Sequence, residues 1–352
     1  MKKLIALLLA LVMVMGLAAC GGSKPAETEA PATEAATEAA TEAATEAPVE
    51  TEAAKPENEK LVIGFAQIGQ ESGWRDAETN DVQWTAARNT DTIELIFVDS
   101  QQKQENQINA IRSFIDQGVD VIAFPPVVET GWEAVLTECQ EAGIPVILVD
   151  RGIDPNADKS LYTTLISSDH VWAGTEAGKA METLLGGEGV VVELEGTVGA
   201  SAATDRKKGF DEYIAANCPG IEIVASQTGD FTRALGKEVM ESFLKSYEKI
   251  DGVFAHNDDM ALGAIEAIKE AGLVPGVDIK IVGVDGVKGA FEAMAAGEMN
   301  CSVECTPILA QQIFDTAWTL KNGGTVESYI MSADGVYFAE DVTEEVLASR
   351  KY

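Results

Sequence analysis

The chain has 352 residues, of which 25 are Lys or Arg and 58 are Asp or Glu, and its formal net charge is −33. This excess of negative charge argues against a nucleic-acid partner, because phosphate binding needs clustered basic side chains. A hydrophobic content of 46% excludes a wholly disordered chain, and the length suits about two domains. Five cysteines are too few for a disulfide scaffold.

Residues 1–20 have the features of an export signal. Lys2 and Lys3 precede an apolar stretch over residues 4–17, which is shorter than the roughly 20 apolar residues that span a bilayer. The stretch ends in Leu17-Ala18-Ala19-Cys20, which resembles a bacterial lipobox. We therefore expect a lipid on Cys20 and an exported protein, held at the outer face of the cell membrane or in the periplasm. The alternative is an ordinary signal peptide with an incidental cysteine.

Residues 21–60 predict an acidic tether. The segment repeats Glu-Ala-Ala-Thr and contains no aromatic residue, so it has almost nothing to bury against the entropy of ordering. We expect it to be disordered, with a typical span of roughly 35 Å for about 40 residues. Such a segment would link a lipid anchor to a mobile domain.

From residue 61 onward, short apolar runs alternate with helical patterns. Strands are expected at residues 61–66, 93–98, 119–124 and 144–149, with helices over 74–88, 105–117 and 131–142. The pattern restarts with strands at 161–166, 190–194, 221–225, 252–255 and 281–284, and residues 301–352 have a strand, helix, strand, helix pattern. Continuous Val and Ile runs are typical of strands buried on both faces. The alternation predicts an α/β fold with two doubly wound parallel sheets.

Polar and aromatic residues follow several of these strands, where open α/β sheets bind ligands. In the first half they are Glu71, Ser72, Trp74, Arg75, Asp150 and Arg151, and in the second half Arg206, Phe231, Asn257 and Asp285. Charged planar groups hold hydroxyls through paired hydrogen bonds, and an aromatic ring packs on the C–H face of a sugar. The mixture predicts a site for a neutral polyol, with no metal and no cofactor.

Each candidate also has a structural interpretation. Asn257 and Asp285 fall where helix N-caps are common, and Trp74 could belong to the core. Arg151 and Arg206 are harder to explain in this way, because an arginine at the carboxyl end of a buried strand needs a partner. The prediction of a site depends on charged groups following several strands in both halves.

Six motifs carry a family resemblance: Ser72-Gly73-Trp74-Arg75, Val149-Asp150-Arg151, Asp205-Arg206-Lys207-Lys208-Gly209-Phe210, Gly229-Asp230-Phe231-Thr232-Arg233, His256-Asn257-Asp258-Asp259-Met260-Ala261-Leu262-Gly263-Ala264 and Gly283-Val284-Asp285-Gly286. With them, residues 61–352 resemble the type I sugar-binding proteins of bacterial ABC importers. Residues 101–107, 125–132 and 195–201 are closer still to the galactofuranose-binding members of that family. The acidic tether and the segment Cys301-Ser302-Val303-Glu304-Cys305 are not part of their pattern.

The resemblance implies a set of ligand-binding residues and two lobes. At matching positions the family's ligand residues are Trp74, Arg75, Arg151, Arg206, Phe231, Asn257 and Asp285, with Glu71, Ser72 and Asp150 as neighbours. Glu304 joins them on a looser alignment. The implied lobes are residues 61–166 plus 307–328 and residues 167–306 plus 329–352, with crossings near Ile166, Thr306 and Tyr329.

The implied function is capture of a monosaccharide between the lobes and its delivery to the permease subunits of an ABC importer. We expect a monomer that is not an enzyme and that meets the membrane only through its lipid anchor. One alternative is a lipoprotein that senses sugar for a receptor without transport. A less favoured alternative is a carbohydrate-active enzyme with His256, near Asp258, as general base. Cys139, Cys218, Cys301 and Cys305 are expected to be reduced and structural.

Overall fold

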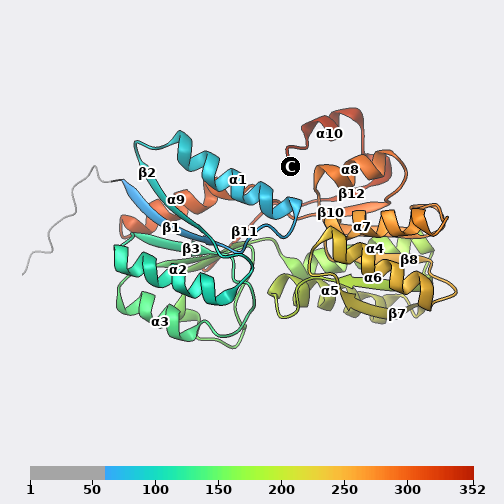
Figure 1. Ribbon diagram of the computed structural model, residues 1–352, viewed down its shortest axis with the longest axis horizontal. Coiled ribbons are helices and arrows are strands. Elements are labelled where there is room, and N and C mark those ends of the chain that lie inside the picture. The colour runs from blue at the N-terminus through green and yellow to red at the C-terminus, as the bar shows by residue number, and fades with distance from the viewer. Residues whose placement is uncertain (1–59) are drawn as a thin grey trace, which may run out of the picture. The chain divides into compact units, whose positions relative to one another are not determined.

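The computed structural model describes residues 60–352, which contain two six-stranded sheets with helices packed on them (Figure 1). The expected signal sequence, Cys20 and the acidic tether lie outside the described residues. Within residues 60–352, every helix is too short or too polar to cross a membrane.

The first of two sheets has six parallel strands in the order β11-β5-β4-β3-β1-β2. Its strands are β1 (Leu61–Gln67), β2 (Ile93–Asp99), β3 (Val121–Phe124), β4 (Val146–Val149), β5 (Thr164–Ser167) and β11 (Tyr329–Met331). The central strands β3 and β4 are buried at every residue, which is why they appear in the sequence as unbroken apolar runs.

Helices cover both faces of the first sheet, and together they form lobe 1 (Figure 1). One face packs against α1 (Gly73–Arg88) and α9 (Ala310–Lys321), and the other against α2 (Gln104–Gln117) and α3 (Glu133–Glu141). The single-turn helix η1 (Lys159–Leu161) precedes β5. Helix α1 matters most for the site because its first turn lies at the carboxyl end of β1.

The second sheet has the order β12-β10-β9-β8-β6-β7. Its strands are β6 (Glu188–Glu195), β7 (Gly220–Thr228), β8 (Gly252–Ala255), β9 (Lys280–Asp285), β10 (Cys301–Glu304) and β12 (Val336–Phe338). Five of them are parallel, and β12 is an antiparallel edge strand paired with β10.

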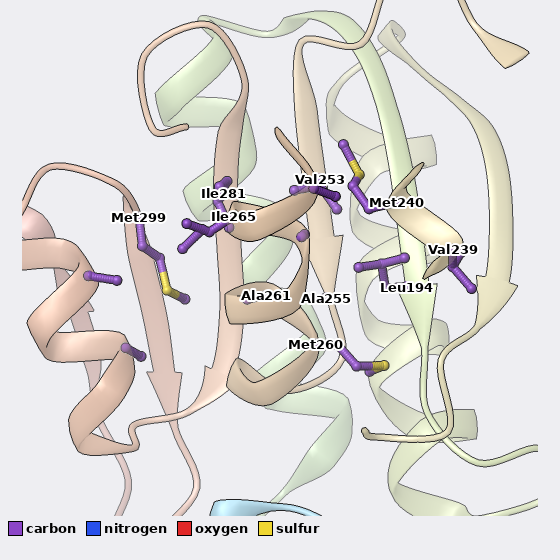
Figure 2. Packing of buried hydrophobic residues seen from close by; sticks show 14 of the residues in the cluster. Leu194, Val239, Met240, Val253, Ala255, Met260, Ala261, Ile265, Ile281 and Met299 are labelled. Atoms are coloured by element: carbon purple, nitrogen blue, oxygen red, sulfur yellow. The ribbon is translucent and has the colours of Figure 1, made fainter. Parts of the chain in front are cut away.

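Lobe 2 is the second sheet with the helices that cover it. One face packs against α6 (Arg233–Ser246), α7 (Asp258–Glu270) and α8 (Lys288–Ala295), and the other against α4 (His170–Leu185) and α5 (Ser201–Asn217). Figure 2 shows the first of these layers, where Met240, Met260 and Ile265 pack onto strands that carry Leu194, Val253 and Ile281. The short helices η2 (Ala339–Asp341) and α10 (Glu344–Ser349) follow β12.

The chain passes between the lobes after β5, after β10 and after β11. The third passage differs from the expected one, because Tyr329–Met331 was assigned to lobe 2 and instead pairs with β5 of lobe 1. The strand has three residues, none of them buried, so its sequence does not indicate which of the two sheets it joins. The lobe change therefore falls between Met331 and Val336.

The four cysteines of the described residues, Cys139, Cys218, Cys301 and Cys305, are buried and free of disulfide bonds. Burial raises the pKa of each thiol. The neutral thiols therefore behave as small apolar groups in the packing of the two lobes.

Candidate functional site

A pocket lies between the lobes, at the carboxyl ends of their strands. It is lined by Glu71, Ser72, Trp74, Arg75, Asp150, Arg151, Ala202, Arg206, Phe231, Asn257 and Asp285. Ten of these residues are sequence-predicted candidates, and the structure brings them together from six places in the chain. Ala202, in the first turn of α5, completes the wall.

Lobe 1 contributes a ring of alternating charges to this pocket. Arg75 Nη2 donates to Asp150 Oδ2 at 2.5 Å and to Glu71 Oε1 at 3.3 Å. Arg151 Nη2 donates to the same Glu71 oxygen at 2.5 Å, and its Nε lies 3.6 Å from Asp150 Oδ2. Each guanidinium thus contacts both carboxylates, and all four side chains are nearly buried. Such a ring holds its members in fixed positions, because any rotation would unpair a buried charge.

The ring controls protonation of its members. Burial alone would raise the pKa of Asp150, but the guanidinium of Arg75, the His170 side chain and the guanidinium of Arg151 hold it well below its ordinary range. Burial likewise opposes the charge on Arg75, yet Glu78, Asp150 and Glu71 raise its pKa above the usual value. Asp150 and Arg75 are therefore both ionised at neutral pH, and their charges compensate within the wall.

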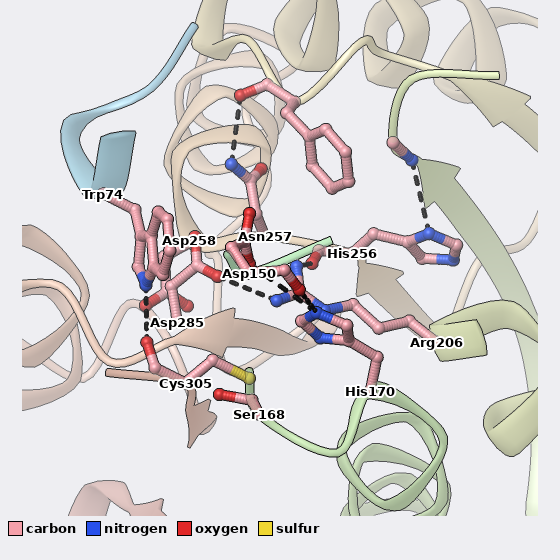
Figure 3. A network of polar contacts seen from close by, with 12 residues as sticks. Trp74, Asp150, Ser168, His170, Arg206, His256, Asn257, Asp258, Asp285 and Cys305 are labelled. Atoms are coloured by element: carbon pink, nitrogen blue, oxygen red, sulfur yellow. Dashed lines mark hydrogen bonds and ion pairs between the residues drawn. The ribbon is translucent and has the colours of Figure 1, made fainter. Parts of the chain in front are cut away.

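Lobe 2 contributes a second charged pair. Arg206, on α5, donates from Nη1 to the backbone oxygen of His256 at 2.6 Å and from Nη2 to Asp285 Oδ1 at 3.2 Å (Figure 3). Burial raises the pKa of Asp285 well above its ordinary value, and Arg206 offsets this effect only in part. The Arg206 guanidinium thereby stands at the end of β9, facing the pocket.

Asn257 both caps a helix and lines the pocket. Its Oδ1 accepts a hydrogen bond from Met260 N at 3.0 Å, so it is the N-cap of α7, and its Nδ2 donates to Phe231 O at 3.0 Å. The cap expected from the sequence is therefore present, and it does not exclude a place in the site. The second bond fixes the loop that carries Phe231 (Figure 3).

Two aromatic rings complete the pocket. Phe231 makes cation–π contacts with two guanidinium groups, since the Cζ atoms of Arg151 and Arg206 lie 5.0 Å and 5.9 Å from its ring centroid. Trp74 is 5% exposed, and its Nε1 donates to Cys305 O at 2.5 Å (Figure 3). Both rings therefore line the pocket with fixed orientations.

Three pocket residues adopt backbone conformations that side chains other than glycine rarely take. The φ angles are 61° at Asp150, 59° at Phe231 and 124° at Asp285. Each conformation costs roughly 1–3 kcal/mol and persists only where the surroundings impose it. Strain of this kind gathers at ligand sites, and here Asp285 ends β9 while Asp150 and Phe231 follow β4 and β7.

Glu304 is the one predicted site residue that the structure places elsewhere. Its Oε1 accepts hydrogen bonds from Arg350 Nη1 and from Tyr352 Oη, and its Oε2 accepts one from Tyr337 Oη. The C-terminal residues supply a cation and hydroxyls to this nearly buried carboxylate, so the side chain turns toward them. Glu304 does not line the pocket and instead anchors the end of the chain.

His256, the candidate base of the enzyme alternative, lies behind the pocket. It is fully buried, its Nε2 is 2.8 Å from Glu193 Oε1, and its Nδ1 accepts from Gly196 N at 3.3 Å. Both ring nitrogens are thus occupied, and neither reaches the cavity. Within residues 60–352, no group of three or more His, Cys, Asp or Glu side chains is placed to hold a metal ion.

The sequence analysis did not identify Glu78, which does not line the pocket itself but holds the pocket residue Arg75 in place. Its Oε2 accepts from Arg75 Nη1 at 2.5 Å and from Gln67 Nε2 at 3.0 Å, and the side chain is fully buried. Its spacing of three residues from Arg75 on α1 was the available signal, because residues three apart share a helix face.

Comparisons with known proteins agree with this architecture. Residues 63–325 match a family model described as a periplasmic binding protein domain. The galactofuranose-binding protein YtfQ of Escherichia coli (strain K12) is 50% identical over 295 residues, which cover 83% of this chain and 92% of that protein.

Two solved structures are similarly close. The binding protein of an arabinose ABC transporter from Shewanella sp. ANA-3, bound to L-arabinofuranose, is 48% identical with a TM-score of 0.78, over 82% of this chain and 95% of that one. A protein from Mycobacterium smegmatis in complex with β-D-fucofuranose is 49% identical with a TM-score of 0.79, over 83% and 95% of the two chains. This chain therefore belongs to the periplasmic binding protein domain family, and its two parallel-sheet lobes have the type I fold of that family.

Proposed function

We propose that the protein captures an uncharged monosaccharide of the galactofuranose type between its two lobes. The observation that carries the proposal is the pairing of every guanidinium in the pocket with a carboxylate: Arg75 and Arg151 with Glu71 and Asp150, and Arg206 with Asp285. A site built for an anion would leave a cation unpaired for it. A site of balanced charges instead offers many donors and acceptors to neutral hydroxyls.

The ring form of the relatives' sugars supports the same ligand class. The relatives compared above are named for, or bound to, galactofuranose, L-arabinofuranose and β-D-fucofuranose. All three are five-membered ring forms, so a furanose is the preferred candidate.

Binding is coupled to lobe closure in this proposal. Glu71, Arg75, Asp150 and Arg151 belong to lobe 1, and Arg206, Phe231, Asn257 and Asp285 to lobe 2. A sugar that contacts both groups favours the closed arrangement by its differential affinity for it. The closed protein then presents both lobes to the permease of an ABC importer, and no chemical step on the sugar is required.

The proposal includes a lipid anchor at Cys20. Its support is the sequence Leu17-Ala18-Ala19-Cys20 behind a short apolar stretch, followed by the acidic segment. Expression in a bacterium with radiolabelled palmitate should label the wild type and leave Cys20→Ser unlabelled. Equal labelling of both proteins, or of neither, would remove the anchor from the proposal.

The binding function is tested by calorimetry with a panel of furanose and pyranose sugars. We expect micromolar or tighter binding of a furanose, and a loss on the order of 2–5 kcal/mol in Arg151→Ala and in Arg206→Ala, since each leaves a buried partner unpaired. Arg112→Ala is the matched control, because that arginine pairs with Glu138 on an exposed surface of lobe 1. Unchanged affinity in both pocket variants would refute the site, and products in the sugar incubation would favour an enzyme instead.

A further inference from the structure

Asp259 of lobe 2 reaches across to the first turn of α1 in lobe 1. Its Oδ2 accepts a hydrogen bond from the backbone N–H of Gly73 at 2.7 Å. Gly73 lies between Ser72 and Trp74, both of which line the pocket, whereas neither Gly73 nor Asp259 does so. The contact thus joins the two lobes beside the pocket without forming part of its wall.

The chemistry of a helix start makes this contact strong. The first N–H groups of an α-helix have no acceptor within the helix, and the Ser72 side chain serves only the N–H of Arg75. The N–H of Gly73 is therefore free for an outside acceptor, and both the helix dipole and the charge favour a carboxylate there. Arg233 Nη2 and Nε donate to Asp259 Oδ1 at 2.9 Å and 3.2 Å, which orients the carboxylate toward α1.

Trp74 docks the same turn onto lobe 2. Its ring belongs to the hydrophobic cluster of that lobe, and its Nε1 donates to Cys305 O at 2.5 Å. Removing Trp74 would also change the pocket wall, so it cannot report on closure alone. The Gly73–Asp259 contact can be removed from either side while every pocket side chain stays in place.

We propose that Asp259 is a positioning residue that sets sugar affinity by stabilising the closed arrangement of the lobes. The inference rests on the proposed function, because it concerns how tightly the same pocket retains a sugar. Affinity for a ligand of the closed form scales with the fraction of the protein that is closed. A bond made only between the lobes therefore increases affinity without touching the ligand.

The test removes the contact from each side in turn. Asp259→Ala deletes the acceptor, and Gly73→Pro deletes the donor. Proline is favoured at the first position of a helix, and the extended conformation of Ser72 (φ −155°, ψ 164°) is compatible with a following proline. Asp259→Ala should bind L-arabinose, which has a furanose form, about tenfold more weakly in calorimetry. Gly73→Pro should lose at least as much, because the proline ring also occupies the space in front of Asp259 Oδ2. The double variant should be no weaker than either single variant, because both remove one bond.

Three controls separate this effect from damage to the fold. Asp259→Asn keeps an oxygen acceptor for Gly73 and should recover part of the affinity. Glu344→Pro places a proline at the first position of α10, an exposed residue away from the pocket, and should leave affinity unchanged. Small-angle scattering measures the radius of gyration of each protein without sugar. Because the contact favours the closed arrangement, this radius should be larger in Asp259→Ala and in Gly73→Pro than in the wild type.

The outcomes distinguish this inference from the proposed function. Additive losses in Asp259→Ala and Gly73→Pro, or affinity and sugar-free scattering both equal to the wild type, would overturn the role of Asp259. A wild type that binds no sugar would refute the proposed function. In that case the scattering comparison still decides whether the contact holds the lobes together.

Discussion

Arg151 of lobe 1 lies over the ring of Phe231 of lobe 2, with the guanidinium carbon 5.0 Å from the ring centroid. The ring is also 5.9 Å from the guanidinium carbon of Arg206. A single aromatic side chain thus joins the charged groups of both lobes through cation–π contacts. In the proposed function, the same ring also packs against C–H groups of the sugar.

We predict that Phe231→Leu weakens sugar binding by about tenfold, since it keeps apolar bulk and removes the aromatic face that guanidinium and sugar share. Calorimetry with the best furanose measures the change. Phe210→Leu is the matched control, because Phe210 stacks on Phe254 inside lobe 2 and does not line the pocket. Equal losses in the two variants would show that the effect is one of general packing.

Gly196 should prove essential for binding although it does not line the pocket. A Cβ atom there would lie 2.0 Å from Phe231 Cζ, so Gly196→Ala must displace the ring. We predict a loss of affinity at least as large as that of Phe231→Leu. Combining Gly196→Ala with Phe231→Ala, which removes the clashing ring, should cost no more affinity than Phe231→Ala alone. A Gly196→Ala protein with full affinity would contradict the packing described.

The Glu193 carboxylate should make the free energy of unfolding depend on pH in the acidic range. Although burial alone would raise its pKa, hydrogen bonds and charges from His256, Lys207 and Ser226 lower the pKa of Glu193 to about 2. Because the folded-state pKa lies below the ordinary value of 4.5, this stabilisation is present above about pH 4.5 and disappears as pH falls toward 2.

We therefore predict that Glu193→Gln lowers the free energy of unfolding by on the order of 2–3 kcal/mol at pH 7. The difference from the wild type should shrink steadily between pH 4.5 and pH 2. Urea denaturation at a series of pH values measures it. A difference that stays constant across this range would show that the charge on Glu193 is not the source.

Glu304→Gln should separate anchoring from binding. We expect sugar affinity within about twofold of the wild type, because Glu304 lies outside the pocket. Stability should fall by about 1–3 kcal/mol, since the substitution leaves Arg350, nearly buried against Phe291 and Tyr337, without its carboxylate. Glu71→Gln is the contrast, because Glu71 bridges Arg75 and Arg151 in the pocket and should lose affinity. Equal losses of sugar affinity in Glu304→Gln and Glu71→Gln would show that Glu304 takes part in sugar binding.

Much of the fold follows from periodicity alone. The runs at residues 61–66, 252–255 and 281–284 appear as β1, β8 and β9 within a residue of their ends, because strands buried on both faces need continuous apolar sequence. The sequence predicted one strand between the last two helices, whereas the structure has two strands there, β11 and β12, of three residues each and in different sheets. Pairing with β5 and with β10 defines them, and a local pattern does not identify that partner.

The candidate site likewise contains residues that the sequence could predict and residues that it could not. Arg151, Arg206 and Asp285 were predictable because they follow buried strands, and the fold requires strand ends to converge. Glu304 also ends a strand, yet Arg350 and Tyr352, some fifty residues later, draw its side chain away. Asp259 lies within one of the six family motifs, but its sequence context predicts no role for it, because its partner is a backbone N–H group of the other lobe. Contacts of this kind leave no trace in residue type or spacing.

The last passage of the chain between the lobes couples the stability of lobe 1 to that of lobe 2. Over the ten residues from Tyr329 to Phe338, β11 closes the edge of the first sheet and β12 closes the edge of the second. Detachment of this segment would leave β5 in lobe 1 and β10 in lobe 2 as unpaired edge strands at the same time. Heating should accordingly melt the folded body as one cooperative transition, and deleting the segment from residue 329 onward should leave two halves that aggregate through their bared edges.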